Sequence, residues 1–373
     1  MGWVLTLSAT LSISNDPRIS ESLIPAKSMD STNLDFLRAS AVSMVLLFHV
    51  FDFFGIKRLG PFEPQAMGGL GVLLFFVHTS FVLMLSLERQ FENFGRQRLF
   101  LMFMLRRCFR IYPLSVFVVA VITFLRLPLA GTPWSLHWPE VGRLDILSNL
   151  LLTQNLTNSP SIPGPLWSLP FEMQMYLVLP ALFLLARRLQ SPWTVALAWL
   201  PITGLVFLCL HAGHGYRVKY VPCFLAGVIA YRFSLAVRGR WLAWAWPLVL
   251  WGSALLFMFV GMLEAAWWIC FAIGMLLPRF TEMRQPLVRQ ASHLIAKYSY
   301  GIYLTHVVCI WLAFVQLRML PLAGRWVVLI VTLVIIPVLL YHLLEAPLIN
   351  AGKKVVERWL APGEVHALAG RTA

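Results

Sequence analysis

Charged residues are scarce in this chain, and acidic residues are the scarcest of them. Only 12% of the 373 residues are charged, with 16 Asp and Glu against 30 Lys and Arg, whereas a soluble domain carries about 25%. The five cysteines stand singly, with no Cys-x-x-Cys pair and no Cys/His cluster at metal-ligand spacing. The composition therefore excludes a soluble globular domain, and neither a disulfide framework nor a metal site is predicted.

Most of the chain consists of long apolar segments. Hydrophobic residues make up 59% of the chain, and the mean hydropathy is +0.75. We predict an all-α polytopic membrane protein whose transmembrane helices bundle around a central cavity. About ten segments have spanning length: 34–54, 68–87, 103–127, 166–186, 192–211, 218–236, 242–260, 263–279, 295–317 and 326–349.

The basic residues indicate how the chain crosses the membrane. An even number of spans puts both termini on one side, and 21 of the 30 Lys and Arg then fall on that side, against 8 on the other. Because basic loops stay in the cytoplasm, both termini are predicted to be cytoplasmic. The net charge of +14 is explained by this topology and by contacts with anionic membrane lipids, so no nucleic-acid partner is indicated.

A single membrane domain, 34–349, is expected between two tails. The first 30 residues are Ser-rich and lack the features of a signal peptide, so 1–33 is interpreted as a loose cytoplasmic tail in which Met29 is an alternative start to Met1. Residues 350–373 are interpreted as the cytoplasmic C-terminal tail. The proline-rich external connection, about 128–165, favours an ordered cap with a short helix at 143–153.

Arg38 and His49 interrupt the first apolar run. They are eleven positions apart, which returns His49 to the face of Arg38 roughly 16 Å further along a helix. Ionisable groups inside a membrane are costly and usually face a cavity or a partner, so both residues are candidates for a site. Asp35, one turn before Arg38, is close enough to orient it. The alternative for Arg38 is a side chain that extends to the lipid headgroups.

Four further motifs carry polar residues into apolar surroundings. Arg107 and Arg110 share a helical face and suit phosphate oxygens, although positive loops near membranes also explain arginines. Glu172 lies about two turns inside a helix near Tyr176, where it has either a catalytic role or an arginine partner on another helix. His306 stands out among interfacial tyrosines. Glu345 is expected to be an inward-facing ion-pair partner, and His78, Thr79 and Ser80 to line the cavity.

These motifs together resemble, in chain order, those of the acyltransferase 3 family of integral membrane acyltransferases. The resemblance runs from residue 34 to 349. It rests on Asp35, Arg38 and His49; Gly68-Gly69 with Phe75-Phe76 and Phe81; Arg107 to Pro113; Leu166-Trp167-Ser168 with Glu172 and Tyr176; Tyr300 to His306; and Glu345-Ala346-Pro347. The chain departs from the family pattern where Thr79-Ser80-Phe81 replaces Ser-Gly-Phe and Glu172-Met173 replaces Glu-Glu. Because Ser80 replaces the family's glycine, the sequence argues against a close helix contact at residue 80.

The resemblance implies an O-acyltransferase of a bacterial cytoplasmic (inner) membrane. It would move an acyl group, usually acetyl from cytoplasmic acetyl-CoA, to a sugar hydroxyl of a surface polysaccharide, such as exopolysaccharide or lipopolysaccharide, or of a glycolipid. Acyl-CoA would be a co-substrate, with no permanently bound cofactor. The family's basic motifs fall on Arg38, Arg107 and Arg110, which would bind the phosphates of acyl-CoA.

The chemistry assigns roles to the remaining residues. A hydroxyl is a poor nucleophile at neutral pH, so His49 is predicted to be its general base or an acyl relay, with Glu172 orienting the imidazole or the sugar. The supporting residues are predicted to be Asp35, Ser80, Trp167, Tyr176 and His306. The main alternative is a glycolipid or polysaccharide transporter or flippase, in which the same residues line a pathway. A membrane sensor without chemistry is a third possibility.

Overall fold

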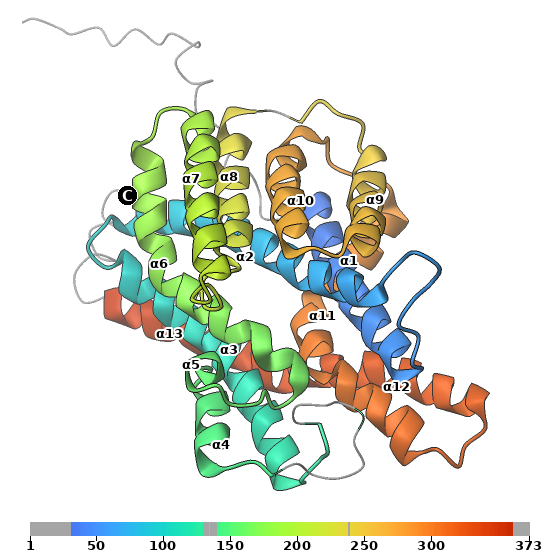
Figure 1. Ribbon diagram of the computed structural model, residues 1–373. Helices are drawn as coiled ribbons and strands as arrows, with labels where there is room; N and C mark the ends of the chain where they lie inside the picture. Colours follow the sequence, from blue (N-terminus) through green and yellow to red (C-terminus); the bar gives the residue numbers. More distant parts are fainter. Residues whose placement is uncertain (1–30, 130–133, 135–139, 238, 361–373) are drawn as a thin grey trace, which may run out of the picture.

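Each of the ten apolar runs falls on a helix in the computed structural model, which describes residues 31–129, 134, 140–237 and 239–360 (Figure 1). The α-helices are α1 (Thr32–Phe53), α2 (Pro64–Phe94), α3 (Leu99–Phe124), α4 (Arg143–Leu150), α5 (Gln154–Thr157), α6 (Leu169–Arg188), α7 (Pro192–His211), α8 (Val221–Ala236), α9 (Ala245–Val260), α10 (Leu263–Leu276), α11 (Pro286–Trp311), α12 (Leu322–Leu340) and α13 (Ala346–Leu360). Four short turns, η2 (Gly164–Ser168), η3 (Leu277–Arg279), η4 (Leu312–Gln316) and η5 (Tyr341–Glu345), adjoin them.

The helices confirm a polytopic membrane protein. Within the described part of the chain, seven are long and apolar enough to cross a membrane: α1, α2, α3, α6 with η2, α7, α11 with η4, and α12 continuing into α13. Helices α8 and α9 are apolar but shorter. The expected count of ten spans and the cytoplasmic placement of both termini stay predictions.

Helix α2 and the last helical segment extend beyond the sequence-based boundaries. Helix α2 begins at Pro64, since proline is tolerated in a first turn, and it ends before Gly95, which has a φ of 69°. The last run does not stop at residue 349, because the π-helical turn η5 leads into α13. Residues 350–360, assigned from the sequence to the C-terminal tail, belong to a helix that packs on α3. The rest of that tail and residues 1–30 lie outside the described residues.

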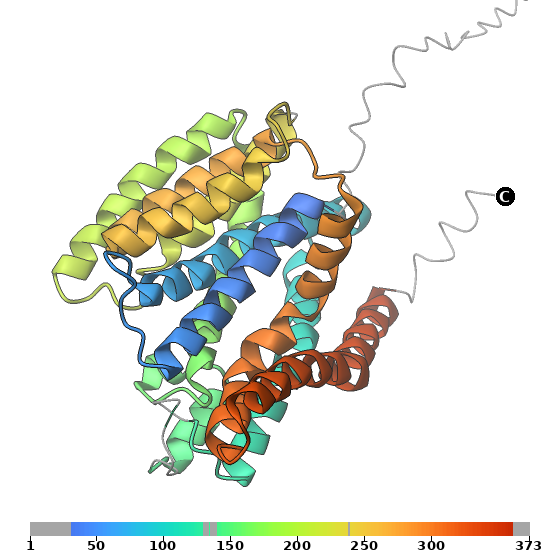
Figure 2. The ribbon, with the colours of Figure 1, turned by 90° about the vertical axis from the view of Figure 1, so that its right-hand side faces the viewer.

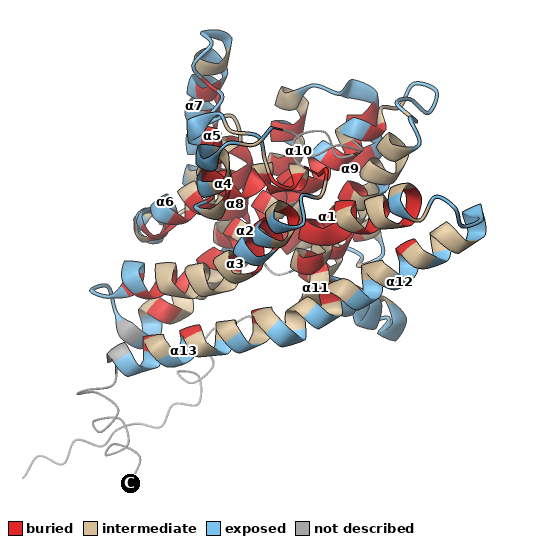
Figure 3. Ribbon diagram, turned by 90° about the horizontal axis from the view of Figure 1, so that it is seen from below, coloured by how far each residue is buried: buried red, intermediate tan, exposed pale blue. Residues whose placement is uncertain are grey.

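Helix α2 is the centre of the bundle. It packs against α1, α8 and α9 and also contacts α3, α6 and α10. Helix α1 lies between α2 and α11, as Figure 2 shows. Helix α12 covers the outside of α11, and most of its residues are exposed or half-buried (Figure 3). Its exposed Ile330, Val334 and Leu339 suit a surface in contact with lipid tails.

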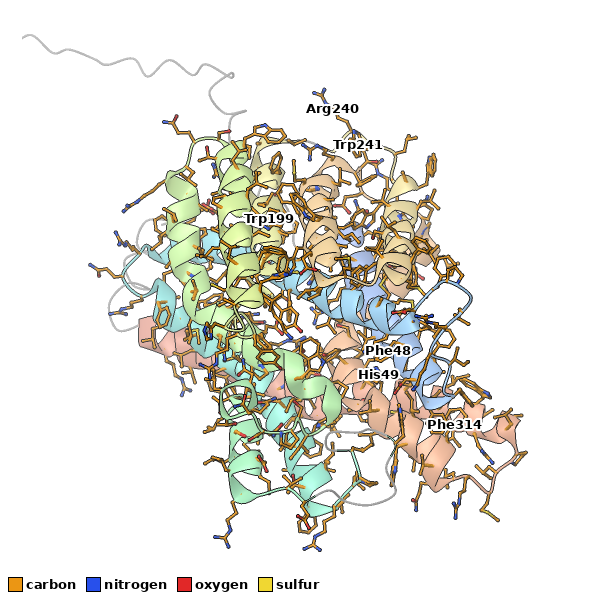
Figure 4. All side chains as sticks on the ribbon, viewed as in Figure 1. Phe48, His49, Trp199, Arg240, Trp241 and Phe314 are labelled. Atoms are coloured by element: carbon orange, nitrogen blue, oxygen red, sulfur yellow. The ribbon has the colours of Figure 1, made fainter. Side chains whose placement is uncertain are left out.

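Helices α1 and α2 approach each other closely through glycines. A Cβ added at Gly71 would lie 2.7 Å from the Ala41 carbonyl oxygen, and one at Gly68 would lie 2.5 Å from the Phe48 ring. The glycine-rich stretch Gly68-Gly69-Leu70-Gly71 thus allows close helix packing. As a result, Phe48 and the adjacent His49 sit directly against the first turns of α2 (Figure 4).

The external connection folds over the end of α1. The predicted short helix at 143–153 is present as α4, followed by α5. The indole Nε1 of Trp134 donates a hydrogen bond of 2.7 Å to Asp52 Oδ2 in the last turn of α1. Residues 130–133 and 135–139, which include part of the predicted cap, lie outside the described residues.

Candidate active site

His49 lines the largest of three adjoining cavities, here called the histidine chamber. Its volume is about 270 Å³, and it is formed by residues of α1, the first turns of α2, η2 and α11. Gln65 and Trp167 also line it, together with Gly69 and Tyr303. The chamber lies at the end of the bundle where α1 ends and α2 begins, and it is the only one of the three that includes His49.

A second histidine lies against His49. The two rings are 4.7 Å apart at an angle of 66°, and His306 Nε2 lies 3.2 Å from His49 Nδ1. His49 Nδ1 is also 2.9 Å from the Val45 carbonyl oxygen. Only 1% of His306 is exposed, because it projects from α11 into its contact with α1. The structure thus pairs two predicted site residues that are 257 positions apart in the sequence.

The arginines converge on a second cavity, here called the arginine pocket. It has a volume of about 80 Å³ and lies nearer the end where α1 begins. Five of the predicted site residues line it: Arg38, Arg107, Arg110, Glu172 and Tyr176. His78 and Thr79 of α2 line it as well, as expected for cavity residues.

Arg38 is held by α11 rather than by its neighbour in α1. Its Nε donates to Ser299 Oγ at 2.6 Å, and the Ser299 hydroxyl in turn donates to the Ala296 carbonyl oxygen. Asp35, which was expected to orient Arg38, instead lies 3.0 Å from His293 Nδ1 in a partly exposed pair. In the structure, the hydrogen-bonding partner of the Asp35 carboxylate is therefore a histidine from α11.

The other two arginines have different surroundings. Arg110 Nη1 lies 2.9 Å from Glu345 Oε2, which confirms Glu345 as an inward-facing ion-pair partner. Arg107 Nε is buried and has no hydrogen-bond partner among the described residues. Beside them, the Tyr176 hydroxyl donates to Glu172 Oε1. The pocket therefore combines three guanidinium groups with the Glu172 carboxylate.

A third cavity of about 60 Å³, here called the narrow cavity, lies between the first two and shares lining residues with each. It shares Arg38, Thr79, Glu172 and Tyr300 with the arginine pocket. It shares Val72 and Tyr303 with the histidine chamber. The three cavities consequently form a row along α1, from its arginine to its histidine.

Tyr303 stands where the narrow cavity meets the histidine chamber. Its hydroxyl donates to the Pro165 carbonyl oxygen at 2.8 Å and accepts a bond of the same length from Ser168 Oγ. Its ring is buried and contacts Phe75. These bonds fix the side chain at the boundary between the two cavities.

Ser80 lies outside this row, contrary to the prediction that it supports the site. Its hydroxyl donates to the Phe76 carbonyl oxygen at 2.7 Å within α2, and it faces Gly227 of α8, where an added Cβ would overlap it. The close contact that seemed lost at residue 80 is therefore made by a glycine on the opposite helix. The sequence of α2 alone could not predict that α8 supplies the glycine of this contact.

Sequence reasoning missed several residues of the site. Ser299 and Tyr303 belong to the motif before His306, but small hydroxyls and tyrosines near a membrane surface gave no reason to select them. Their polar contacts cross to α1 and η2, so only the tertiary structure identifies them. Within the described residues, no group of three His, Cys, Asp or Glu side chains is placed to hold a metal ion.

Comparison with known proteins gives one match. A model of the acyltransferase 3 family, described as an acyltransferase domain, matches residues 31–342. This range covers most of the chain and includes all three cavities. No curated protein and no solved structure matches the chain.

Proposed function

The chain belongs to the acyltransferase 3 family, and we propose that it transfers an acyl group, acetyl in the simplest case, from a cytoplasmic acyl-CoA to a hydroxyl of a carbohydrate or glycolipid. His49 is the general base in this proposal. The observation that carries it is the row of cavities between Arg38 and His49. A donor held at the arginines and an acceptor held at the histidine would meet along that row.

The donor side is assigned to the arginine pocket. Phosphate groups bind guanidinium forks well, and Arg107 offers a buried N–H without a protein partner in the described chain. The pocket and the narrow cavity measure only about 80 and 60 Å³, well below the roughly 300–1,000 Å³ typical of sites for drug-sized ligands. We therefore place the nucleotide at the mouth of the pocket, with only the thin pantetheine arm and the thioester entering the row.

The acceptor side is assigned to the histidine chamber. Trp167 offers a flat apolar face and Gln65 an amide, and ligand sites use such combinations to hold and orient a molecule. The chamber lies at the opposite end of α1 from the basic, cytoplasmic side assigned by the distribution of Lys and Arg. This arrangement supports an acceptor that arrives from outside the cell, as a surface polysaccharide or glycolipid would.

The reaction balances without a further reactant. The acceptor oxygen forms a bond to the thioester carbonyl carbon while its proton passes to His49 Nε2. The C–S bond then breaks, and the leaving thiolate takes the proton from Nε2. The products are an ester and free coenzyme A, and His49 returns to its neutral state.

The test is transfer by purified protein in detergent or nanodiscs with radiolabelled acetyl-CoA and a panel of glycan and glycolipid acceptors. The parent protein should label an acceptor. His49→Ala should lose at least about 100-fold in rate, in line with the usual contribution of a general base, while its thermal unfolding stays within a few degrees of the parent. Full activity in that variant would refute the assignment of His49.

Two measurements distinguish an acyltransferase from a transporter. A flippase or transporter without chemistry would translocate a glycolipid in proteoliposomes and leave acetyl-CoA intact. Release of free coenzyme A that depends on the acceptor, measured with a thiol reagent, is expected only from the transferase.

A further inference from the structure

The hydrogen bonds of His306, which is buried, and of His49, which is half-buried, indicate where their protons lie. His306 Nδ1 lies 3.1 Å from the Ile302 carbonyl oxygen. A carbonyl oxygen only accepts, so Nδ1 of His306 carries a proton and, in the neutral ring, Nε2 is left as an acceptor. That acceptor faces His49 Nδ1 at 3.2 Å.

The same reasoning fixes the tautomer of His49. Its Nδ1 lies 2.9 Å from the Val45 carbonyl oxygen, so Nδ1 is protonated and its hydrogen is shared between Val45 and His306 Nε2. The lone pair of His49 is then on Nε2. A base must present an unprotonated nitrogen to the acceptor hydroxyl, and this arrangement supplies one.

We propose that His306 is the positioning residue of His49, and that the two imidazoles act as a dyad in which His306 does what the carboxylate does in a Ser-His-Asp triad. In a triad, the third group holds the base in the right tautomer and stabilises the imidazolium that forms. His306 Nε2 would do both through the Nδ1 hydrogen of His49. This inference rests on the proposed function.

An imidazole suits this place better than a carboxylate. His306 is 1% exposed within a membrane protein, where an ionised side chain without a partner is costly. A neutral ring can accept the hydrogen without bringing a charge of its own. During the reaction, the proton from the acceptor arrives at His49 Nε2, the positive charge extends to the Nδ1 hydrogen, and that hydrogen is held more strongly by His306 until the thiolate removes the proton.

Few other ionisable groups face His49. Asp52 on the same helix acts on it through charge, but its Oδ2 accepts from the Trp134 indole. From α11, Tyr303 lines the same chamber. The residues that α2 and η2 contribute to the chamber are uncharged. Within the described residues, His306 is the ionisable side chain that hydrogen-bonds to His49.

The experiment compares His306→Leu and His306→Gln with the parent. Leucine removes the acceptor, whereas the glutamine amide oxygen can accept the His49 hydrogen but cannot take up a proton. We expect His306→Leu to lower kcat by about 100-fold or more, with the KM for acetyl-CoA within about twofold. His306→Gln should recover at least about tenfold of that loss, because a hydrogen bond to the Nδ1 hydrogen is restored.

A matched control and a pH profile distinguish a role of His306 in positioning His49 from a role in packing alone. Thr305→Val changes the neighbouring buried side chain of α11, whose hydroxyl bonds only within its own helix, and it should leave kcat within about threefold of the parent. In His306→Leu, the acidic limb of kcat against pH should move to lower pH, since the protonated His49 ring has lost an acceptor. An unmoved limb, or a kcat within threefold of the parent, would overturn the proposal.

A spectroscopic test does not depend on turnover. In parent protein labelled with ¹⁵N-histidine, the signal of His49, identified by its loss in His49→Ala, should report protonation at Nδ1 and should change in His306→Leu. If the parent transfers no acyl group, the proposed function fails while this measurement still decides the pairing. Protonation of His49 at Nε2 in the parent would overturn the dyad even in an active enzyme.

Discussion

Arg110 on α3 lies 2.9 Å from Glu345 on η5, and the Glu345 side chain is only 1% exposed. The second carboxylate oxygen, Oε1, is buried without a hydrogen-bond partner in the described chain. The Arg110 guanidinium also lies 5.7 Å from the centre of the Tyr300 ring. A buried ion pair therefore joins η5, directly before α13, to α3. Arg107 and Arg110 of α3 line the arginine pocket.

Breaking this pair from the arginine side should destabilise the protein more than breaking it from the acidic side. Arg110→Met leaves a buried, unpaired carboxylate, whereas Glu345→Gln leaves a guanidinium that is 22% exposed. We expect a loss of about 3–5 kcal/mol for Arg110→Met. The double variant Arg110→Met/Glu345→Leu should be more stable than Arg110→Met alone. Reversible unfolding in mixed detergent micelles measures all three.

The matched control is the exposed pair of Arg58 and Glu63, whose side chains are 75% and 44% exposed. Arg58→Met should change the free energy of unfolding by less than about 1 kcal/mol. A double variant Arg110→Met/Glu345→Leu that is no more stable than Arg110→Met alone would show that the lone Glu345 carboxylate does not destabilise the protein.

The helices could be predicted from the sequence because a membrane leaves an apolar run few alternatives. Backbone groups in lipid must bond within the segment, so each long run folds as a helix. The end of the last run could not be predicted in the same way. The π-helical turn at Tyr341–Glu345 continues the chain into α13, and the residues of α13 are polar enough to resemble a tail.

The site was predictable in its parts but not in its connections. Helical spacing placed Arg38 and His49 on one face, and the cavities confirm that both face the interior. Their partners, Ser299 and His306, come from α11, more than 250 positions further along the chain. Contacts over such a separation follow from the packing of α1 against α11, which no local pattern specifies.

Gly227→Ala should destabilise the bundle by separating α2 and α8. A Cβ at this position would overlap both Ser80 Oγ and the Val77 carbonyl oxygen, and the backbone oxygen cannot move aside as a side chain can. We expect a loss of about 1–3 kcal/mol from overpacking, measured by unfolding as above. Gly252→Ala on α9 is the control, since a Cβ there meets no atom within 4 Å, and it should stabilise the helix slightly. Equal effects at the two glycines would contradict the close contact.

The absence of a side chain at Gly69 should leave room for the acceptor in the histidine chamber. A Cβ at this position meets nothing within 4 Å, and the residue lines the cavity beside His49. Gly69→Leu should therefore fold normally but occupy part of the chamber, raising the KM for the acceptor at least about tenfold through lost contacts of 1.4 kcal/mol or more. Acetyl-CoA binding, measured separately by isothermal titration, should be unchanged within about twofold. A weaker donor affinity with an unchanged acceptor KM would reverse the assignment of the two ends.

Arg38→Lys should weaken donor binding although it keeps the positive charge. The Nε hydrogen bond to Ser299 at 2.6 Å orients the guanidinium in the arginine pocket, and a lysine ammonium has neither that hydrogen nor a planar fork for phosphate oxygens. We expect acetyl-CoA affinity to fall about tenfold or more in Arg38→Lys, with a smaller fall in Ser299→Ala, which leaves the guanidinium in place but unheld. The double variant should bind no worse than Arg38→Lys alone, because the serine acts through the arginine. Independent, additive losses would mean that Ser299 contacts the donor directly, and unchanged affinity in Arg38→Lys would remove Arg38 from the donor site.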